Sequence, residues 1–212
     1  MGHTQLVAMT AIPGESLREP HSRSNLTYSK YSRATWDWWC RKNGIGFTVL
    51  DRPLEDDACR GLPPSLQRWI APSILMKEMG TSGQVLMIDA DVMIRWDSPS
   101  PFDLAGSCFA AVQDSYALWV QPSIKAYQPL FPNVTLNWWE YFNTGLTIVN
   151  NSHCDMLRDF VRFAYERWTD WRCIQQSGNF GIDQTLLNFF YDRRMYHCVL
   201  FHRRSTCFIA SR

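Results

Sequence analysis

The sequence predicts an α/β domain whose mixed, mostly parallel sheet is flanked by helices. In the first half of the chain, apolar runs short enough for buried strands alternate with segments of helical character. The third run is followed directly by two acidic residues, and ligands bind at the carboxyl ends of strands in such sheets. The 212 residues, of which 46% are hydrophobic, are enough for one domain with a substantial core.

Three short apolar runs and two helical segments account for the first half of the chain. The strands are expected at residues 5–10, 47–50 and 85–88, and the helices at residues 24–43 and 63–80. Asn43-Gly44 provides a C-cap for the first helix. Pro72 predicts that the second helix is kinked or divided into two short helices.

The second half of the chain is less regular. Its strands are expected at residues 109–112, 146–149 and 196–201, and its helices at residues 155–168 and 183–191. The segment 115–139 is rich in Trp, Pro and Tyr and has no clear period. We expect this segment to form loops over a site.

Composition excludes several classes of protein. The 21 basic residues nearly balance the 20 acidic ones, whereas nucleic-acid binding needs a basic excess, so no nucleic-acid partner is expected. The seven cysteines are scattered without a C-x-x-C pair, which argues against a zinc ribbon and fits a reducing compartment. No signal core begins the chain and no apolar run is long enough to span a membrane, so a soluble cytoplasmic protein is expected.

Asp89 and Asp91 carry the strongest chemical signal. They follow the predicted strand 85–88 at a spacing of two, so that both carboxylates can turn towards one point as the chain leaves the sheet. Two hard oxygen ligands at this position suit Mn²⁺ or Mg²⁺, which bridge substrate phosphates. The plainer alternative is two solvated aspartates in a loop.

The surroundings of this pair resemble glycosyltransferases of the GT-A fold. The D-x-D motif follows two β-α units, and residues 109–114 (FAAVQD) match the small-residue strand that ends in Asp in that family. Residues 141–146 (YFNTGL) are similar to the F-N-x-G segment of the glycogenin and lipopolysaccharide-galactosyltransferase type. Residues 181–188 (GIDQTLLN) resemble its D-Q-x-x-L-N helix start. The motifs occur in the family's order and extend over most of the chain.

The resemblance implies a metal site and a nucleotide site. Asp91 would bind Mn²⁺ or Mg²⁺ directly, and Asp89 would bind the metal and the nucleotide ribose. Thr10 would line the pocket for the base and ribose. The family's late H-x-x-G-x-x-K-P-W segment is missing, so the third metal ligand is open: His202 is the candidate, and a structural histidine is the alternative.

The resemblance also implies residues for the sugar and the acceptor. Asn143 and Gly145 would lie along the donor sugar, where glycine permits close approach of the backbone. Asp183 would hold sugar hydroxyls, Gln184 would lie near the anomeric carbon, and Asp114 would face the acceptor. Residues 1–112 would thus form a nucleotide-binding half and residues 113–212 a sugar-binding and acceptor-binding half of one catalytic domain.

These roles imply transfer from a nucleotide-diphosphate sugar, by resemblance a UDP-sugar, to a glycan or glycoprotein acceptor. A divalent metal stabilises the leaving diphosphate without proton transfer. Net retention would place the Gln184 amide on the far face of the sugar, whereas inversion would need Asp114 or Asp183 as a base. The F-N-x-G and D-Q motifs favour retention. Size and aromatic loops also resemble the N-terminal domain of chlorovirus glycosyltransferases that decorate the capsid protein, which would imply host cytoplasm and a longer parent protein.

Two other classes of function are alternatives. Phosphohydrolases of the haloacid-dehalogenase type also have D-x-D after an apolar strand, but usually the first strand, and with a later G-D-x-x-x-D pair that this chain lacks. A non-catalytic carbohydrate-binding module would use aromatic faces such as Trp138-Trp139 and Trp36-Trp38-Trp39. Each of the ten tryptophans can instead fill the core.

Overall fold

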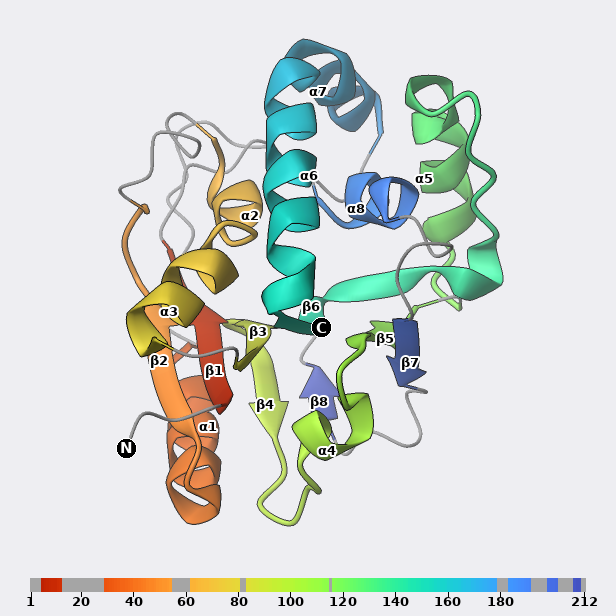
Figure 1. Cartoon of the computed structure of the whole chain (residues 1–212). Coiled ribbons are helices and arrows are strands. Elements are labelled where there is room, and N and C mark those ends of the chain that lie inside the picture. The colour runs from red at the N-terminus through yellow and green to blue at the C-terminus, as the bar shows by residue number, and fades with distance from the viewer. Residues whose placement is uncertain are drawn as a thin grey trace.

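The computed structural model describes residues 5–12, 29–54, 62–80, 83–114, 116–178, 183–191, 198–201 and 208–210. Within these residues one mixed sheet of six strands lies between two layers of helices (Figure 1). The strands follow the order β2-β1-β3-β6-β5-β7. Their bounds are Gly46–Leu50 for β2, Gln5–Thr10 for β1, Gln84–Asp89 for β3, Phe142–Asn150 for β6, Phe109–Gln113 for β5 and Cys198–Phe201 for β7.

Strand direction confirms the predicted mixed α/β sheet. Strand β1 pairs in parallel with β2 and β3, and β5 pairs in parallel with β7. Strand β6 runs antiparallel to both of its neighbours, β3 and β5. A second, two-stranded antiparallel sheet joins β4 (Val92–Ile94) to β8 (Phe208–Ala210). The chain therefore enters this small sheet directly from the end of β3.

Each face of the sheet has its own apolar core. Val7, Met9, Leu86 and Ile88 face one cluster, together with α1 (Ser29–Asn43) and α4 (Pro101–Ala105). The alternate residues of the same strands face a larger cluster on the opposite side, because successive side chains of a strand point to opposite faces. That cluster includes α2 (Pro64–Gln67), α3 (Ala71–Met79), α5 (Val120–Tyr127), α6 (Cys154–Glu166), α7 (Trp168–Ser177) and α8 (Gln184–Phe190).

The predicted elements of the first half are confirmed with small changes of boundary. Helix α1 begins at Ser29, residues 24–28 lie outside the described part, and Gly44 has a φ of +67° beyond its end, as a C-cap requires. The second helical segment is divided, as Pro72 predicted. Pro72 lies in the first turn of α3, where the backbone N–H has no partner within the helix, so its absence in proline removes no hydrogen bond. The break between the two helices therefore falls just before Pro72, at residues 68–70.

The prediction of loops throughout residues 115–139 was wrong. The segment contains α5 and two 3₁₀ helices, η2 (Gln128–Leu130) and η3 (Trp138–Glu140). Val120, Ser123 and Tyr127 form the buried face of α5, at helical spacing. Because a serine occupies one of these positions and a proline lies in the first turn, hydrophobicity alone did not show the period.

Other elements were missed or extended. The helix predicted to reach residue 168 ends at Glu166, and a non-helical Arg167 separates it from α7, which was not predicted. Strands β4 and β8, helix α4 and η4 (Asn151–His153) were not predicted either. Strand β6 is longer than the predicted 146–149 and begins at Phe142. Among the described residues, no helix is long and apolar enough to cross a membrane.

Candidate active site

The carboxyl ends of three neighbouring strands meet at one edge of the main sheet. Thr10 ends β1 and pairs in register with Leu50 at the end of β2 and with Asp89 at the end of β3. Asp91 lies two residues further on, in the turn between β3 and β4. Thr10 Oγ1 is buried and has no hydrogen-bond partner among the described residues. The predicted nucleotide-binding and metal-binding residues of this half of the chain are therefore together.

Arg68, between α2 and α3, lies against this edge. Its side chain is 4% exposed, and its Nη1 donates a hydrogen bond to Asp89 Oδ1. Its Nε and Nη2 groups are buried without a hydrogen-bond partner in the described structure. The guanidinium lies 5.0 Å from the centre of the Trp69 ring. A buried cation with unused donors is costly unless carboxylates or a ligand compensate it, so Arg68 is part of the site.

Asp91 and Asp89 are close enough for their charges to interact. Burial raises the pKa of Asp91, the charge of Asp89 raises it further, and a backbone hydrogen bond and Arg68 lower it. Two carboxylates that repel each other at a strand end form a set of hard oxygen ligands, and a divalent cation between them would remove the repulsion. The residues present therefore fit Mn²⁺ or Mg²⁺.

The third metal ligand is not found in the described structure. Among those residues, no group of three or more His, Cys, Asp or Glu side chains is arranged to hold a metal. His202, the sequence candidate, lies outside the described residues. Two carboxylates would leave the remaining coordination positions to phosphate oxygens and water, which is usual for Mg²⁺.

Gly145 brings β6 against Asp89. A Cβ atom at position 145 would lie 2.8 Å from Asp89 Oδ2 and 2.8 Å from Asn143 Oδ1. The Gly145 N–H donates to Asn143 Oδ1 over 2.7 Å. Only glycine fits this position without a shift of its neighbours.

Asn143, Gln184 and Asp114 form a connected cluster of two amides and one carboxylate. Asp114 is 2% exposed, and its Oδ2 accepts from Gln184 Nε2 at 3.1 Å and from Asn143 Nδ2 at 3.4 Å. Asn143 Nδ2 also lies 3.3 Å from Gln184 Oε1. The cluster joins the end of β5, the start of β6 and the first residue of α8, so residues far apart in the sequence share one wall.

Asp183 connects this cluster to Arg68. It precedes α8, and its Oδ2 accepts a hydrogen bond from Trp69 Nε1 at 2.9 Å. Burial raises the pKa of Asp183 to about 6; Arg68 lowers it, Asp89 raises it, and the Trp69 and backbone hydrogen bonds lower it. Asp183 is therefore a buried carboxylate that interacts electrostatically with both Arg68 and Asp89.

The structure gathers the predicted residues that it describes into one continuous site. Strand register, hydrogen bonds and charge link these residues to one another. They are Thr10, Asp89, Asp91, Asp114, Asn143, Gly145, Asp183 and Gln184. Sequence reasoning missed Arg68 and Trp69. One signal was present: Arg68 is the single charged residue of segment 62–76.

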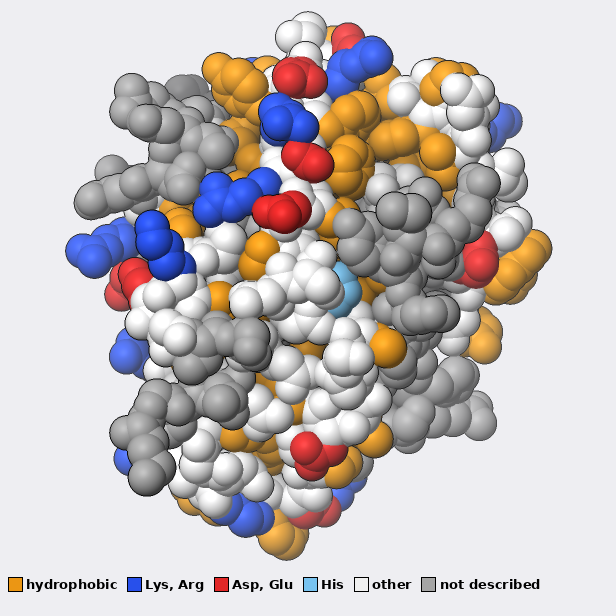
Figure 2. Space-filling view, in the orientation of Figure 1, with side chains coloured by type: hydrophobic (Ala, Val, Ile, Leu, Met, Phe, Trp, Pro, Cys, Tyr) orange, Lys and Arg blue, Asp and Glu red, His pale blue; other side chains and the backbone are white. Residues whose placement is uncertain are grey.

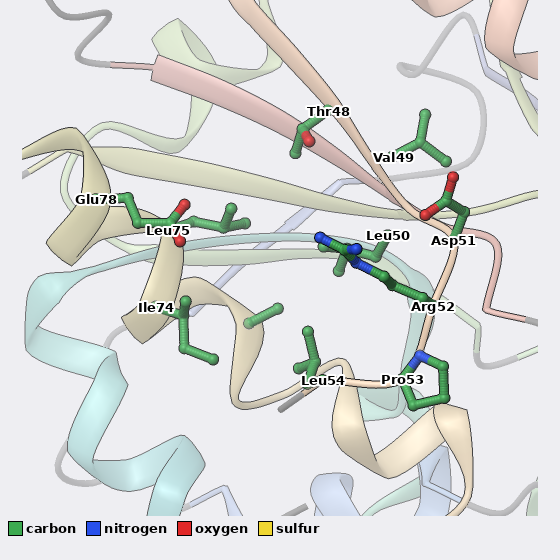
Figure 3. A pocket seen from close by; sticks show the side chains of 11 residues that line it. Thr48, Val49, Leu50, Asp51, Arg52, Pro53, Leu54, Ile74, Leu75 and Glu78 are labelled. Atoms are coloured by element: carbon green, nitrogen blue, oxygen red, sulfur yellow. The ribbon is translucent and has the colours of Figure 1, made fainter. Parts of the chain in front are cut away.

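A cavity at the outer edge of the sheet is separate from this cluster. It has a volume of about 380 Å³ and lies between β2, the loop after it, and α3. Figure 3 shows Leu54, Ile74 and Leu75 on its apolar side and the Arg52 side chain reaching across it. None of the acidic residues of the site lines this cavity.

The mixed sheet, with its acidic pair at the end of β3, is the GT-A-like fold of glycosyltransferases. A glycosyltransferase involved in the glycosylation of the major capsid of PBCV-1 has a similar structure, with a TM-score of 0.57 and 11% identity over 93% of this chain and 81% of that one. The galactosyltransferase LgtC matches with a TM-score of 0.42 and 14% identity, over 88% and 70% of the two chains. Mouse xyloside xylosyltransferase 1 matches with a TM-score of 0.45 and 8% identity, over 95% and 85%. No protein-family model and no curated protein matches the sequence.

Proposed function

We propose that this chain is a metal-dependent glycosyltransferase that moves a sugar from a nucleotide-diphosphate donor, a UDP-sugar, to a glycan or glycoprotein acceptor. One observation carries the proposal: the buried Arg68 bonds Asp89 and interacts electrostatically with Asp91 and with the buried Asp183. A carbohydrate-binding module has no need of three interacting carboxylates beside one buried cation. The GT-A-like fold adds support.

The donor would lie across the ends of β1 and β3. Thr10 would face the base and ribose with its unpartnered hydroxyl, and Asp89 and Asp91 would hold Mn²⁺ or Mg²⁺. When bound, the metal would stabilise the charge of the departing diphosphate as a Lewis acid. Arg68 would donate its unused N–H groups to the donor, in a site where burial strengthens each hydrogen bond.

The wall formed by β5, β6 and α8 would hold the sugar. Asn143 and the Gly145 backbone would lie along it, and Asp183 would accept hydrogen bonds from its hydroxyls. Gln184 would lie near the anomeric carbon, and Asp114 would face the acceptor. The Gln184 amide beside the reacting carbon favours net retention, because an amide cannot act as a base, whereas inversion would use Asp114 at the acceptor as the base. The anomeric configuration of the product, read by NMR, tests this part separately.

Calorimetric titration of UDP, GDP and CMP, each with and without Mn²⁺, tests the proposal. We expect Mn²⁺-dependent binding of UDP, weakened at least tenfold in Asp91→Ala. Asp97→Ala is the matched control, since it removes an exposed carboxylate that pairs only with Arg95 in the described structure. A chain that binds none of the three nucleotides in the presence of Mn²⁺ is not a glycosyltransferase of this kind.

A further inference from the structure

A groove lies beside the segment that precedes β6, the strand that carries Asn143. It has a volume of about 710 Å³, within the range of ligand sites, and lies between the outer face of α5 and the segment that leads from α5 to β6. Its lining residues are Gln121, Ile124, Lys125, Gln128, Pro129, Pro132, Leu136, Asn137 and Trp138. Hydrophobic surface is exposed at this edge of the molecule, on the right of Figure 2.

The groove is held in shape by its own hydrogen bonds. Gln128 Nε2 donates to the carbonyl oxygens of Phe131 and Val134 at 2.8 and 2.7 Å. Asn137 Nδ2 donates to Glu140 Oε2 at 2.9 Å. These bonds fix the segment between α5 and β6 before any ligand arrives, and a preformed site binds without the cost of ordering a loop.

Trp138 and Trp139 present their rings to solvent. Their ring centres lie 5.8 Å apart at an angle of 83°, and the residues are 39% and 52% exposed. The buried indoles of Trp36, Trp39 and Trp171 donate to backbone carbonyls, whereas the described structure gives the Trp138 and Trp139 N–H groups no partner. An exposed indole with a free donor offers an apolar face and a polar edge to one ligand.

Two hydrogen bonds, one from a side chain and one from the backbone, connect the segment of the indole pair to the end of β5. Gln113 Nε2 donates to the Trp139 carbonyl oxygen at 2.6 Å, and the Asp114 N–H donates to the Tyr141 carbonyl oxygen at 2.9 Å. Four residues lie between Trp138 and Asn143, so their Cα atoms are at most about 18 Å apart even in a fully extended chain. A ligand whose end lies at Asp114 therefore reaches the indoles with its next few units.

The lining of the groove matches a neutral, hydroxylated ligand. Three amides stand beside apolar carbons from prolines, Ile124 and Leu136, and Lys125 is the single charged side chain among the lining residues. A peptide or nucleic acid selected by charge would require more ionic groups. Sugar rings present C–H faces to indoles and hydroxyls to amides.

We propose that this groove, with the indoles of Trp138 and Trp139, binds the sugar units of an oligosaccharide acceptor beyond the unit that receives the transferred sugar. The inference rests on the proposed function and deepens it: the acceptor is an extended glycan, and monosaccharides are poor acceptors because they leave the groove empty.

An array of immobilised glycans, from monosaccharides to hexasaccharides, tests the proposal with the full chain in the presence of UDP and Mn²⁺. We expect retention only by glycans of two or more units. Trp138→Ala is expected to weaken it at least tenfold, and Trp138→Phe, which keeps an aromatic face, to weaken it less. Trp96→Ala is the matched control, because this 68% exposed indole lies beyond β4 and contacts Lys42.

Calorimetry of UDP with Mn²⁺ on the same variants separates the two proposals. Intact nucleotide binding in Trp138→Ala with lost glycan retention supports the groove. Three results would overturn the proposed glycan-binding groove without affecting the proposed transferase activity. These are unchanged glycan retention in Trp138→Ala, equal retention of monosaccharides, and no retention of any glycan by a chain that binds UDP. A wild-type chain that binds no nucleotide overturns the transferase itself.

Discussion

Arg68 is the cation around which the acidic residues of the site gather. Its guanidinium bonds Asp89 and lowers the pKa of both Asp91 and Asp183. We expect Arg68→Met to bind Mn²⁺ alone more tightly, because the carboxylates lose a competing positive charge. The same variant should bind a nucleotide-sugar at least tenfold more weakly, because two N–H donors are lost.

Calorimetry of Mn²⁺ with and without nucleotide measures both effects. Arg158→Met serves as the control, since that arginine bonds only the half-buried side chain of Ser73 in the described structure. Weaker binding of Mn²⁺ alone by Arg68→Met would mean that Asp89 and Asp91 do not bind the metal together.

Gly145 gives a second prediction at the residue scale. In Gly145→Ala the new methyl group meets Asp89 Oδ2 and Asn143 Oδ1 and must displace both of them. We expect Mn²⁺-dependent UDP binding to fall at least tenfold, with a change of less than about 1 kcal/mol in the free energy of unfolding. Gly80→Ala is expected to show the opposite pattern, with lower stability and unchanged UDP binding. The space around Gly80 is open, but its φ of +65° is unfavourable for alanine.

At the scale of elements, one hydroxyl holds α5, α8 and β6 together. Thr185 Oγ1 lies 2.6 Å from Ser123 Oγ and 2.6 Å from Tyr141 Oη, and all three residues are buried. Thr185→Val keeps the shape and removes a hydrogen-bond partner from the hydroxyls of Ser123 and Tyr141, of which Tyr141 still interacts with Gln184. We expect a loss of about 1 to 3 kcal/mol in the free energy of unfolding, measured by urea denaturation.

The effect of Thr185→Val should extend to the site, because Thr185 follows Gln184 in α8. Thr135→Val, at an exposed position, is the control and should change stability by less than about 0.5 kcal/mol. Equal stabilities of the two variants would show that this buried network does not hold the wall of the site.

The elements also show what the sequence could predict. Buried strands such as β1 and β3 are continuous apolar runs, so their positions were predictable, and the acidic residues were marked by motifs at strand ends. The direction of β6 was not predictable, because the long connection from residue 114 to residue 141 permits either direction. Arg68 and Thr185 were missed because their roles depend on which helices pack together, which local periodicity does not contain.

At the scale of the whole molecule, two buried groups make opposite contributions to the dependence of stability on pH. Burial lowers the pKa of His153 from 6.5 to about 4, and its Nδ1 accepts the Asn150 N–H. The unfolded chain therefore takes up this proton first, so stability is lost as the pH falls from 6.5 towards 4. The pKa of Asp183 is raised from 3.8 to about 6, so the folded chain keeps that proton longer and stability is lost as the pH rises through 4 to 6.

Each contribution amounts to about 3 kcal/mol at most and the two oppose each other, so the wild type should show a pH slope between those of the two single variants. Single variants should reveal the slopes in urea denaturation with a chelator present. His153→Asn, whose amide oxygen can still accept the Asn150 N–H, should leave a chain that becomes less stable as the pH rises from 4 to 6. Asp183→Asn should leave one that becomes more stable over the same interval. The double variant should again have an intermediate slope, because the groups lie in different parts of the fold and their effects should add. Parallel pH profiles for all four chains would show that neither group is held away from its ordinary pKa.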